Sequence, residues 1–414
     1  MEKLKQIIKE YEEISFEGLP RGYDLELFRL KSALTIIGPR RSGKTTYLRE
    51  IIHTLKLEHF LFLNFEDERI LPIKEFDTFI EAFYELYQQK PHIFLDEVQN
   101  TELWHLKVRR LIDQNYKVFI TGSNANLLSS EIATHLAGRT YIRKVLPFTF
   151  QEFLRLKNIA FSPDAIYGKG RFAIKDGFRE FLLFGGFPEE IQTKLKKELL
   201  RQYFEFVFYK DLIARHKIRQ ETPVRLLLQK LVENLGKSYQ VSRLRNRISQ
   251  IVPVSKQALF DYLRFLEESF LVVHLKNYQK SFLRREMERK TYFIDTGFLG
   301  ILTIDLEYGK LLENVVFLEL FKRDRKLFYH KMKHECDFVV STDNHITDAH
   351  QVCWELNDAN RDREINGLLE AMNYFQLTTG LIITHAQEED IDFDGKRIEV
   401  RPAWKWALTL ESKL

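Results

Sequence analysis

The chain has 414 residues, of which 44% are hydrophobic and 29% charged, and its formal net charge is +4. This composition excludes a disordered tail or a fibre and predicts a globular protein of two or three domains. Apolar runs such as 269–275 fall far short of the roughly 20 residues that cross a bilayer, so we expect no membrane span. A charged amino terminus and only two cysteines, Cys336 and Cys353, favour an intracellular, cytoplasmic protein.

Positive charge is concentrated in the middle of the chain. Residues 201–290 carry 19 basic and 9 acidic side chains, whereas residues 291–414 carry 14 and 22. A basic segment of this kind is typical of a surface that contacts nucleic acid. The alternative is a basic face that packs on the chain's own acidic third, and the count favours neither.

The first third alternates strand-like and helical patterns. Apolar runs with strand character lie at 34–37, 60–65, 93–95 and 118–121. Between them, apolar residues recur on one helical face, as they do in a crossover helix that lies on a sheet. The alternation predicts an α/β domain with a mostly parallel sheet.

The pattern G-x-x-x-x-G-K-[ST] follows the first strand-like run and opens a helical stretch. Its residues are Gly38, Pro39, Arg40, Arg41, Ser42, Gly43, Lys44 and Thr45, with Thr46 next. A glycine-bounded loop directs successive N–H groups to one point, and the helix start adds partial positive charge. We therefore expect a Walker A loop that holds nucleotide phosphates, with Lys44 at the β- and γ-phosphates and Thr45 at Mg²⁺.

Two acids, Asp96 and Glu97, end the strand-like run at 93–95. In a nucleotide hydrolase this Walker B position supplies a carboxylate for the metal and a second one for water. We expect Asp96 to bind Mg²⁺ and Glu97 to polarise the attacking water. The alternative is a strand end that only meets solvent. A glutamate directly after the aspartate favours hydrolysis over mere retention of nucleotide.

Two further residues are candidates for the catalytic site. Ser123, or Asn124 beside it, follows the run at 118–121, and the carboxyl ends of parallel strands form the edge that binds ligands. Turn residues occur at such ends in any case. Arg139 precedes a strand-like run at 140–145 and could sense phosphate in its own subunit or in a neighbour of a homo-oligomer. A plain salt bridge is the alternative for Arg139.

The motifs of this chain, taken in order, resemble those of a known family. They are GPRRSGKTT, HIFLDEVQ, FITGS, LAGR, LPFTFQEF, GGFPEEI, YKDLIARHKI, YFIDTGFL, LLENVVFLEL and ECDFVV. They are similar to the archaeal and bacterial AAA+ type ATPases that carry a winged helix and a nuclease-like carboxyl domain of unassigned function. The resemblance covers the chain from about residue 30 to the end. It implies ATP as the nucleotide and a sheet in which the Walker A and Walker B strands are separated.

Three domains are expected on this basis. A P-loop AAA-like ATPase domain with a helical extension would span residues 1–200, a winged helix domain 201–298, and a PD-(D/E)XK nuclease-like domain 299–414.

The middle third has the pattern of a winged helix: three helical stretches, then a strand, a basic loop at 277–290 and a returning strand. In a version that binds DNA, the third helix faces a groove and the loop touches phosphates. The residues that would contact DNA are Lys256, Gln257, Arg264, Arg284 and Arg285. Winged helices also serve as modules that bind proteins, which is the alternative.

The carboxyl third resembles the PD-(D/E)XK nucleases, in which a helical acid, a strand acid and an E-x-K strand hold Mg²⁺. The corresponding residues are Glu319, Asp337, Gln351 and Cys353, with Glu313 on the same helical stretch. An amide and a thiol replace the last carboxylate and the lysine, which weakens metal binding and water activation. Residues 351–355 are expected to form one strand, and Glu355 could compensate from the same face, because residues 351, 353 and 355 alternate to one side. We expect a fold kept for structure or binding more than an active nuclease.

Taken together, the motifs predict Mg²⁺-dependent ATP hydrolysis that moves a winged helix and a nuclease-like domain, acting on DNA. A slow ATP-dependent switch that binds a protein partner is the second hypothesis. The third is a metal-dependent nuclease that ATP regulates.

Overall fold

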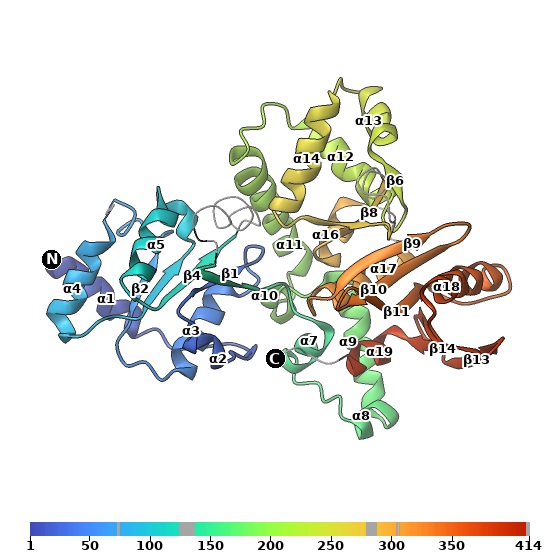
Figure 1. The fold of residues 1–414 in the computed structure, drawn as a ribbon, viewed down its shortest axis with the longest axis horizontal. Helices are drawn as coiled ribbons and strands as arrows, with labels where there is room; N and C mark the ends of the chain where they lie inside the picture. The colour runs from blue at the N-terminus through green and yellow to red at the C-terminus, as the bar shows by residue number, and fades with distance from the viewer. Residues whose placement is uncertain are drawn as a thin grey trace. The chain divides into compact units, whose positions relative to one another are not determined.

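The computed structural model describes the chain except residues 73–74, 124–135, 137, 279–287, 304, 306 and 411–414. It divides into two compact units (Figure 1). One unit comprises Met1–Leu146 and Glu268–Phe270, and the other comprises Pro147–Glu267 and the chain from Leu271 onward.

The first unit is an α/β structure. Its elements are α1 (Glu2–Glu12), α2 (Glu26–Arg29), β1 (Ala33–Ile37), α3 (Lys44–Thr54), β2 (Leu61–Asn64), α4 (Phe76–Tyr87), β3 (Ile93–Asp96), the short 3₁₀ helix η1 (Val98–Asn100), α5 (Trp104–Asp113), β4 (Val118–Gly122) and β5 (Thr140–Lys144). The five strands pair in the order β2-β3-β4-β1-β5, and every pair is parallel. The predicted parallel sheet is therefore confirmed.

Helices lie on both faces of this sheet; α3 and α5 are on opposite sides in Figure 1. All five residues of β1 are buried, which explains why it is a continuous apolar run without alternation. Phe94 of β3 stacks on Phe119 of β4, with ring centroids 4.6 Å apart. Because β4 separates β1 from β3, the loop after β1 and the acids after β3 reach the same sheet edge from strands that are not neighbours.

The second unit opens with helices. They are α7 (Phe150–Leu156), α8 (Pro163–Tyr167), α9 (Gly170–Phe184), α10 (Pro188–Gln192), α11 (Lys196–Phe206) and the π-helix η3 (Val207–Ala214). Thr149 and Glu152 form a capping box that starts α7. The motif at 185–191 meets the motif at 292–299, since Asp295 accepts hydrogen bonds from the backbone N–H groups of Gly186 and Gly297, both at 2.8 Å.

A segment of three helices and a small sheet follows. It consists of α12 (Thr222–Glu233), β6 (Tyr239–Gln240), α13 (Val241–Ser249), α14 (Lys256–Glu268), β7 (Val272–Lys276) and β8 (Glu288–Phe293). The sheet has the order β6-β8-β7 and both pairs are antiparallel. Strand β8 begins at Glu288, so Arg289 and Lys290, which were expected in the basic loop, are strand residues instead.

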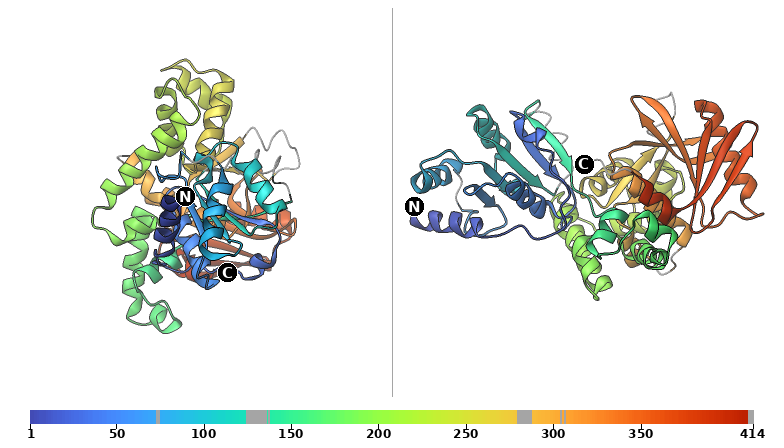
Figure 2. Two further views of the ribbon diagram at one scale, coloured as in Figure 1. Left: turned by 90° about the vertical axis from the view of Figure 1, so that its left-hand side faces the viewer. Right: turned by 90° about the horizontal axis from the view of Figure 1, so that it is seen from below.

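The rest of the second unit is built on a mixed sheet. Its elements are α16 (Thr296–Leu302), α17 (Tyr308–Phe321), β9 (Lys326–Lys331), β10 (Glu335–Thr342), β11 (His345–Val352), α18 (Arg361–Phe375), β12 (Thr379–Thr384), β13 (Glu389–Phe393), β14 (Lys396–Pro402) and α19 (Ala403–Thr409). The strand order is β13-β14-β12-β11-β10-β9, in orange and red in Figure 2. Strands β11, β12 and β14 are parallel, and the remaining pairs are antiparallel.

Residues 147–200, expected as an extension of the ATPase domain, belong to the second unit. The physical reason is specific pairing within that unit. The backbone N–H of Phe150 donates to Glu319 on α17 at 2.8 Å, and Gln151 donates to the carbonyls of Ala407, Leu408 and Leu410 at the end of α19.

Candidate functional site

The loop between β1 and α3 is held in shape by two glycines that are needed for different reasons. A Cβ at Gly38 would lie 1.9 Å from the Val145 carbonyl oxygen, so the close approach to the end of β5 excludes a side chain. Gly43 has open space around it but a φ of +94°, a conformation that glycine adopts without strain. The Ser42 hydroxyl contacts the carbonyls of Pro39 at 2.9 Å and Val145 at 2.7 Å. The loop is thus fixed before α3 begins.

Two pairs of side chains connect this loop with the acids after β3. The Thr45 hydroxyl donates to Asp96 Oδ2 at 2.8 Å. Lys44 Nζ lies 3.2 Å from Glu97 Oε1 and donates to the Pro39 carbonyl at 3.0 Å. The residues of the two predicted motifs therefore lie together at the carboxyl edge of the sheet.

Strand β4 supplies a residue that sequence reasoning missed. The Thr121 hydroxyl donates to Asp96 Oδ1 at 2.5 Å and accepts the backbone N–H of Glu97 at 2.8 Å. The available signal was a threonine on an otherwise apolar buried strand. Glu97 itself has φ 51° and ψ 47°, the left-handed region, which is sparsely populated by residues other than glycine and typical of functional sites.

Ser123 joins this arrangement through Gln99, a second residue that was not predicted. Gln99 Nε2 donates to Ser123 Oγ at 3.2 Å and also to the Glu97 carboxylate. Asn124, the alternative to Ser123, lies outside the described residues.

The pKa values of Asp96 and Glu97 are shifted in opposite directions. Burial and the adjacent Glu97 carboxylate raise the pKa of Asp96 to about 6. Burial also acts to raise the pKa of Glu97, but the charges of Lys44 and Arg40 outweigh it and bring that pKa down to about 2. Glu97 is therefore the firmly ionised member of the pair at neutral pH.

The outer residues of the loop are placed less directly. Arg40 pairs with Glu66 at 2.6 Å, Arg41 is exposed with φ 61°, and Thr46 is half-buried on the first turn of α3.

Arg139 does not join the site within its own chain, contrary to one of the two expectations. Its carbonyl accepts the N–H of Ala33 at the amino end of β1, and its side chain pairs with Asp113 at 3.4 Å. The loop lies at the other end of β1, roughly 16 Å of strand away.

A second cluster of acids lies in the second unit, on α17 and β10. Lys290 Nζ lies 2.8 Å from Asp337 Oδ1, 2.9 Å from Glu335 Oε1 and 3.5 Å from Glu313 Oε1. Burial disfavours the charge of Lys290, but the carboxylates, Asp337 foremost, hold its pKa well above the ordinary value. Burial and the Asp337 charge raise the pKa of Glu313.

Of the four residues predicted for a nuclease-like remnant, only Asp337 lies in this cluster. Glu319 was wrong as its helical acid. Six residues along a helix turn the side chain to another face, and Glu319 instead accepts from Phe150 and pairs with Arg323. Glu313 is the acid of this helix that lies beside Lys290 and Asp337.

Gln351 and Cys353 face α18. Gln351 Nε2 donates to Glu364 at 2.6 Å, and Cys353 packs in the apolar core with Leu368. Glu355 cannot compensate from the strand, because β11 ends at Val352 and Glu355 is exposed. Nothing in the sequence pattern pointed to Lys290 or Glu335 as partners of Asp337.

The residues expected to contact DNA are partly placed. Lys256, Gln257 and Arg264 are exposed on α14. Gln257 and Arg264 both contact Asp261, at 3.3 and 3.2 Å. Arg284 and Arg285 lie outside the described residues.

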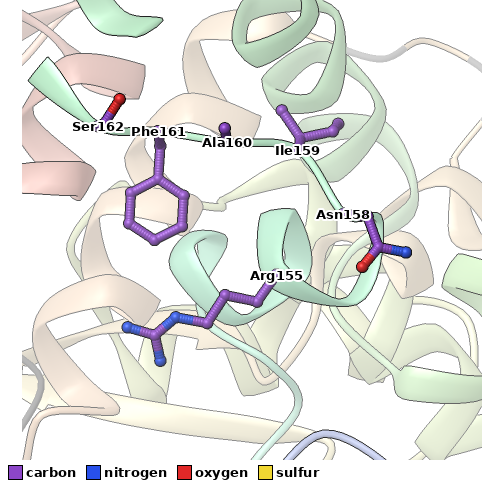
Figure 3. Close-up of a pocket in the computed structure, with 6 residues that line it drawn as sticks. All are labelled: Arg155, Asn158, Ile159, Ala160, Phe161 and Ser162. Atoms are coloured by element: carbon purple, nitrogen blue, oxygen red, sulfur yellow. The ribbon is translucent and has the colours of Figure 1, made fainter. Parts of the chain in front are cut away.

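Other features of the described residues add little. A shallow pocket of about 440 Å³ is lined by Arg155 of α7 and by residues 158–162, which connect α7 with α8, and none of the motif residues lines it (Figure 3). Among the described side chains, no group of three or more His, Cys, Asp or Glu is arranged to hold a metal ion. None of the helices in the described part of the chain has the length and apolar character that crossing a membrane requires.

Comparison with known proteins identifies the class of the first unit. Residues 30–154 match the family model described as an AAA domain, and residues 175–307 match one described as a domain of unknown function, DUF8612. Together with the glycine-bounded loop and the all-parallel sheet, the match defines a P-loop domain of the AAA class. The resemblance of the motifs is confirmed to this extent.

Relatives that span nearly the whole chain define its family. MJ1544, an uncharacterised protein of Methanocaldococcus jannaschii, is 34% identical over 98% of this chain and 95% of its own length. A protein of Haemophilus influenzae is 30% identical over 90% of this chain and 93% of its own. The chain belongs to the family that these two proteins represent. Among solved structures, the Walker-type ATPase PABY2304 of Pyrococcus abyssi is similar over 70% of this chain and 99% of that one, with 14% identity and a TM-score of 0.43, too distant to bear on function.

Proposed function

We propose that this protein binds ATP with Mg²⁺ at the edge formed by β1, β3 and β4 and hydrolyses it. The observation that carries the proposal is the convergence of Thr45 with Asp96 and of Lys44 with Glu97. The donor set fits the ion, since a hydroxyl and a carboxylate are the hard oxygen ligands that Mg²⁺ prefers. Bound Mg²⁺ would supply positive charge against the phosphate oxygens.

Each residue of the site has a defined part in this proposal. The backbone N–H groups of residues 40–46, at the loop and the start of α3, would hold the phosphates, and Lys44 would contact the β- and γ-phosphates. Glu97 would orient the attacking water as an ionised carboxylate, consistent with its pKa of about 2. Gln99, which bridges Glu97 and Ser123, would keep that carboxylate in position.

A turnover assay with purified full-length protein tests the proposal. Replacement of Lys44 with Ala should abolish ATP hydrolysis, and replacement of the exposed Lys31 with Ala should not change it. Turnover at the wild-type level in K44A would refute the proposal. A parallel assay with GTP tests the preference for ATP, which rests on the family resemblance.

We further propose that residues 201–298 form a winged helix that contacts DNA and moves with the nucleotide state. The order α12-β6-α13-α14-β7-β8, with β8 between β6 and β7 in the sheet, supports the winged helix. Arg243 and Arg247 on α13 and Lys256 on α14 are exposed, and the described structure gives none of them an ion pair. Such side chains would contact phosphates and make the affinity depend strongly on salt.

The DNA proposal has a matched test. The double variant Arg243→Glu/Arg247→Glu should weaken binding to duplex DNA and flatten the dependence of log K on log salt. Lys194→Glu/Lys197→Glu changes the charge by the same amount at exposed positions outside this segment and should leave both unchanged. Equal effects of the two variants would mean that the contact is not specific to α13.

One observation favours a second function for this segment, a switch that binds a protein. Asp261 engages both Gln257 and Arg264 on the face expected to meet DNA, and Lys290 is buried among acids. Part of the basic excess of residues 201–290 is thus neutralised within the chain. Absence of DNA binding even at low salt, with ATP turnover intact, would support the switch.

A further inference from the structure

The acid cluster of the second unit has the composition of a cation site. Glu313 comes from α17, and Glu335 and Asp337 come from β10. Three carboxylates that converge on one point are the kind of donor set with which proteins hold a divalent cation. The Lys290 side chain, which is 0% exposed, places its Nζ at that point, within 3.5 Å of all three.

The carboxylates that surround Lys290 also accept hydrogen bonds from other groups. Asp337 Oδ2 accepts the backbone N–H of Val352 at 3.0 Å, and Glu313 Oε1 accepts the Tyr292 hydroxyl at 2.7 Å. Gln351, at the position where a nuclease would have a third ligand, accepts the backbone N–H of Asp337 at 3.2 Å. The cluster therefore forms hydrogen bonds with backbone and side-chain groups of this same chain.

The turn between α12 and β6 lies against the cluster. A Cβ at Gly236, in the turn after α12, would lie 2.3 Å from Glu313 Oε2, so the backbone there lies directly against the carboxylate. At the rim, Lys331 pairs with Glu335 at 3.0 Å and donates to Ser238 at 2.9 Å. The cluster thus joins β8 and the turn after α12 to the mixed sheet.

We infer that the Lys290 ammonium takes the place of a divalent cation in this carboxylate cluster. Its charge compensates the three carboxylates, and the compensation is permanent because Lys290 is a residue of β8. The wild-type cluster accordingly binds no divalent metal, and the site serves to fasten two parts of the second unit. The inference is independent of the proposed ATPase activity, because no residue of the first unit enters it.

Removal of the ammonium should convert the cluster into a metal site. In full-length protein carrying Asp96→Asn, which weakens the proposed Mg²⁺ site of the first unit, we expect Lys290→Met to gain about one Mn²⁺ per chain. Mn²⁺ titration followed by electron paramagnetic resonance measures this gain. Addition of Asp337→Asn to the Lys290→Met chain should remove the site. Lys331→Met, which removes a cation only from the rim, is the matched control and should gain none.

Two outcomes would overturn the inference. One is a folded K290M chain that binds no Mn²⁺ beyond the Asp96→Asn parent. The other is a parent that binds one Mn²⁺ more than its Asp337→Asn variant, which can be measured even if K290M fails to fold. Cleavage of plasmid by the parent with Mn²⁺, lost on Lys290→Met, would also count against it, because Lys290 would then be a catalytic residue.

Discussion

The Thr45 hydroxyl donates to Asp96 Oδ2 at 2.8 Å, although the two residues are 51 positions apart in the chain. The contact joins the first turn of α3 to the end of β3 across the intervening β4. A hydroxyl and a carboxylate held together in this way are ready to share one Mg²⁺.

Replacement of Asp96 with Asn should lower Mg²⁺-dependent ATP turnover by about 10²-fold or more, since a bound metal contributes several kcal/mol to the stabilisation of the transition state. Nucleotide binding measured without Mg²⁺ should persist. Asp113→Asn, at an exposed carboxylate that pairs with Arg139, serves as the control and should retain turnover. An unchanged Mg²⁺ dependence in D96N would remove Asp96 from the metal site.

Replacement of Glu97 with Gln should leave ATP binding intact and reduce hydrolysis by about 10²-fold, because an amide cannot accept the proton of the attacking water. Single-turnover hydrolysis and equilibrium binding of a fluorescent nucleotide separate the two effects. If E97Q loses binding instead, Glu97 acts mainly as the structural partner of Lys44.

Alanine at the two loop glycines should have unequal effects on stability. At Gly38 the new Cβ would meet the Val145 carbonyl at 1.9 Å, so the backbone must shift and the first unit should lose much of its stability. At Gly43 the space is open, and the positive φ costs only about 1–2 kcal/mol. Urea unfolding of G38A and G43A compares them, and a larger loss in G43A would contradict this account.

Replacement of Glu319 with Gln should destabilise the second unit by about 3 kcal/mol, because the buried Arg323 guanidinium would lose its carboxylate. The effect on ATP turnover should be small. Glu355→Gln changes an exposed glutamate in the same way and should alter the unfolding free energy by less than about 0.5 kcal/mol. Equal stability of the two variants would show that the Glu319 pair contributes nothing.

Acid should weaken the second unit through His274. Its Nε2 lies 3.2 Å from the Leu263 carbonyl oxygen and its Nδ1 lies 2.9 Å from the Thr291 hydroxyl, contacts that a neutral ring makes by donating through Nε2 and accepting at Nδ1. Burial, assisted by Arg289, lowers the pKa of His274 to about 3. Below pH 6.5 the unfolded chain binds a proton that the folded chain excludes, so stability falls as the pH falls, by at most about 1.4 kcal/mol per unit.

Urea unfolding between pH 7 and pH 4 measures this effect. His274→Gln should be less stable at pH 7 and should show a shallower dependence on pH. A wild-type unfolding free energy that stays constant or rises toward pH 4 would contradict the expected sign.

The first unit was largely predictable from its sequence. Buried parallel strands are continuous apolar runs, and the loop motif has a fixed strand and helix context, so β1, β3, β4 and the site residues after them followed from pattern. Thr121 and Gln99 were missed because their roles arise from pairing between strands. Helix α1 was missed as well, because the charges of its exposed face dominate the pattern.

The second unit shows why the remainder could not be predicted. Lys290 lies in a sequence of alternating charges that reads as a basic loop, and only the pairing of β8 with β7 carries it into the interior. For Glu313 and Glu319, both on one helix, the sequence offered no means to decide which faces Asp337. Residues 201–290 do carry an excess of basic side chains. A count of charges, however, cannot distinguish an exposed basic side chain from one such as Lys290, whose charge is neutralised by acidic side chains in the interior.

The contacts of Val145 have a mechanical consequence. This residue receives the Ser42 hydroxyl, lies against Gly38, and immediately precedes Leu146, after which the chain passes from the first compact unit into the second. The loop of the candidate site therefore contacts the chain one residue before it leaves the first unit. A rearrangement of the loop would change the contacts of Ser42 and Gly38 with Val145, and these two contacts lie next to the peptide that links the two units.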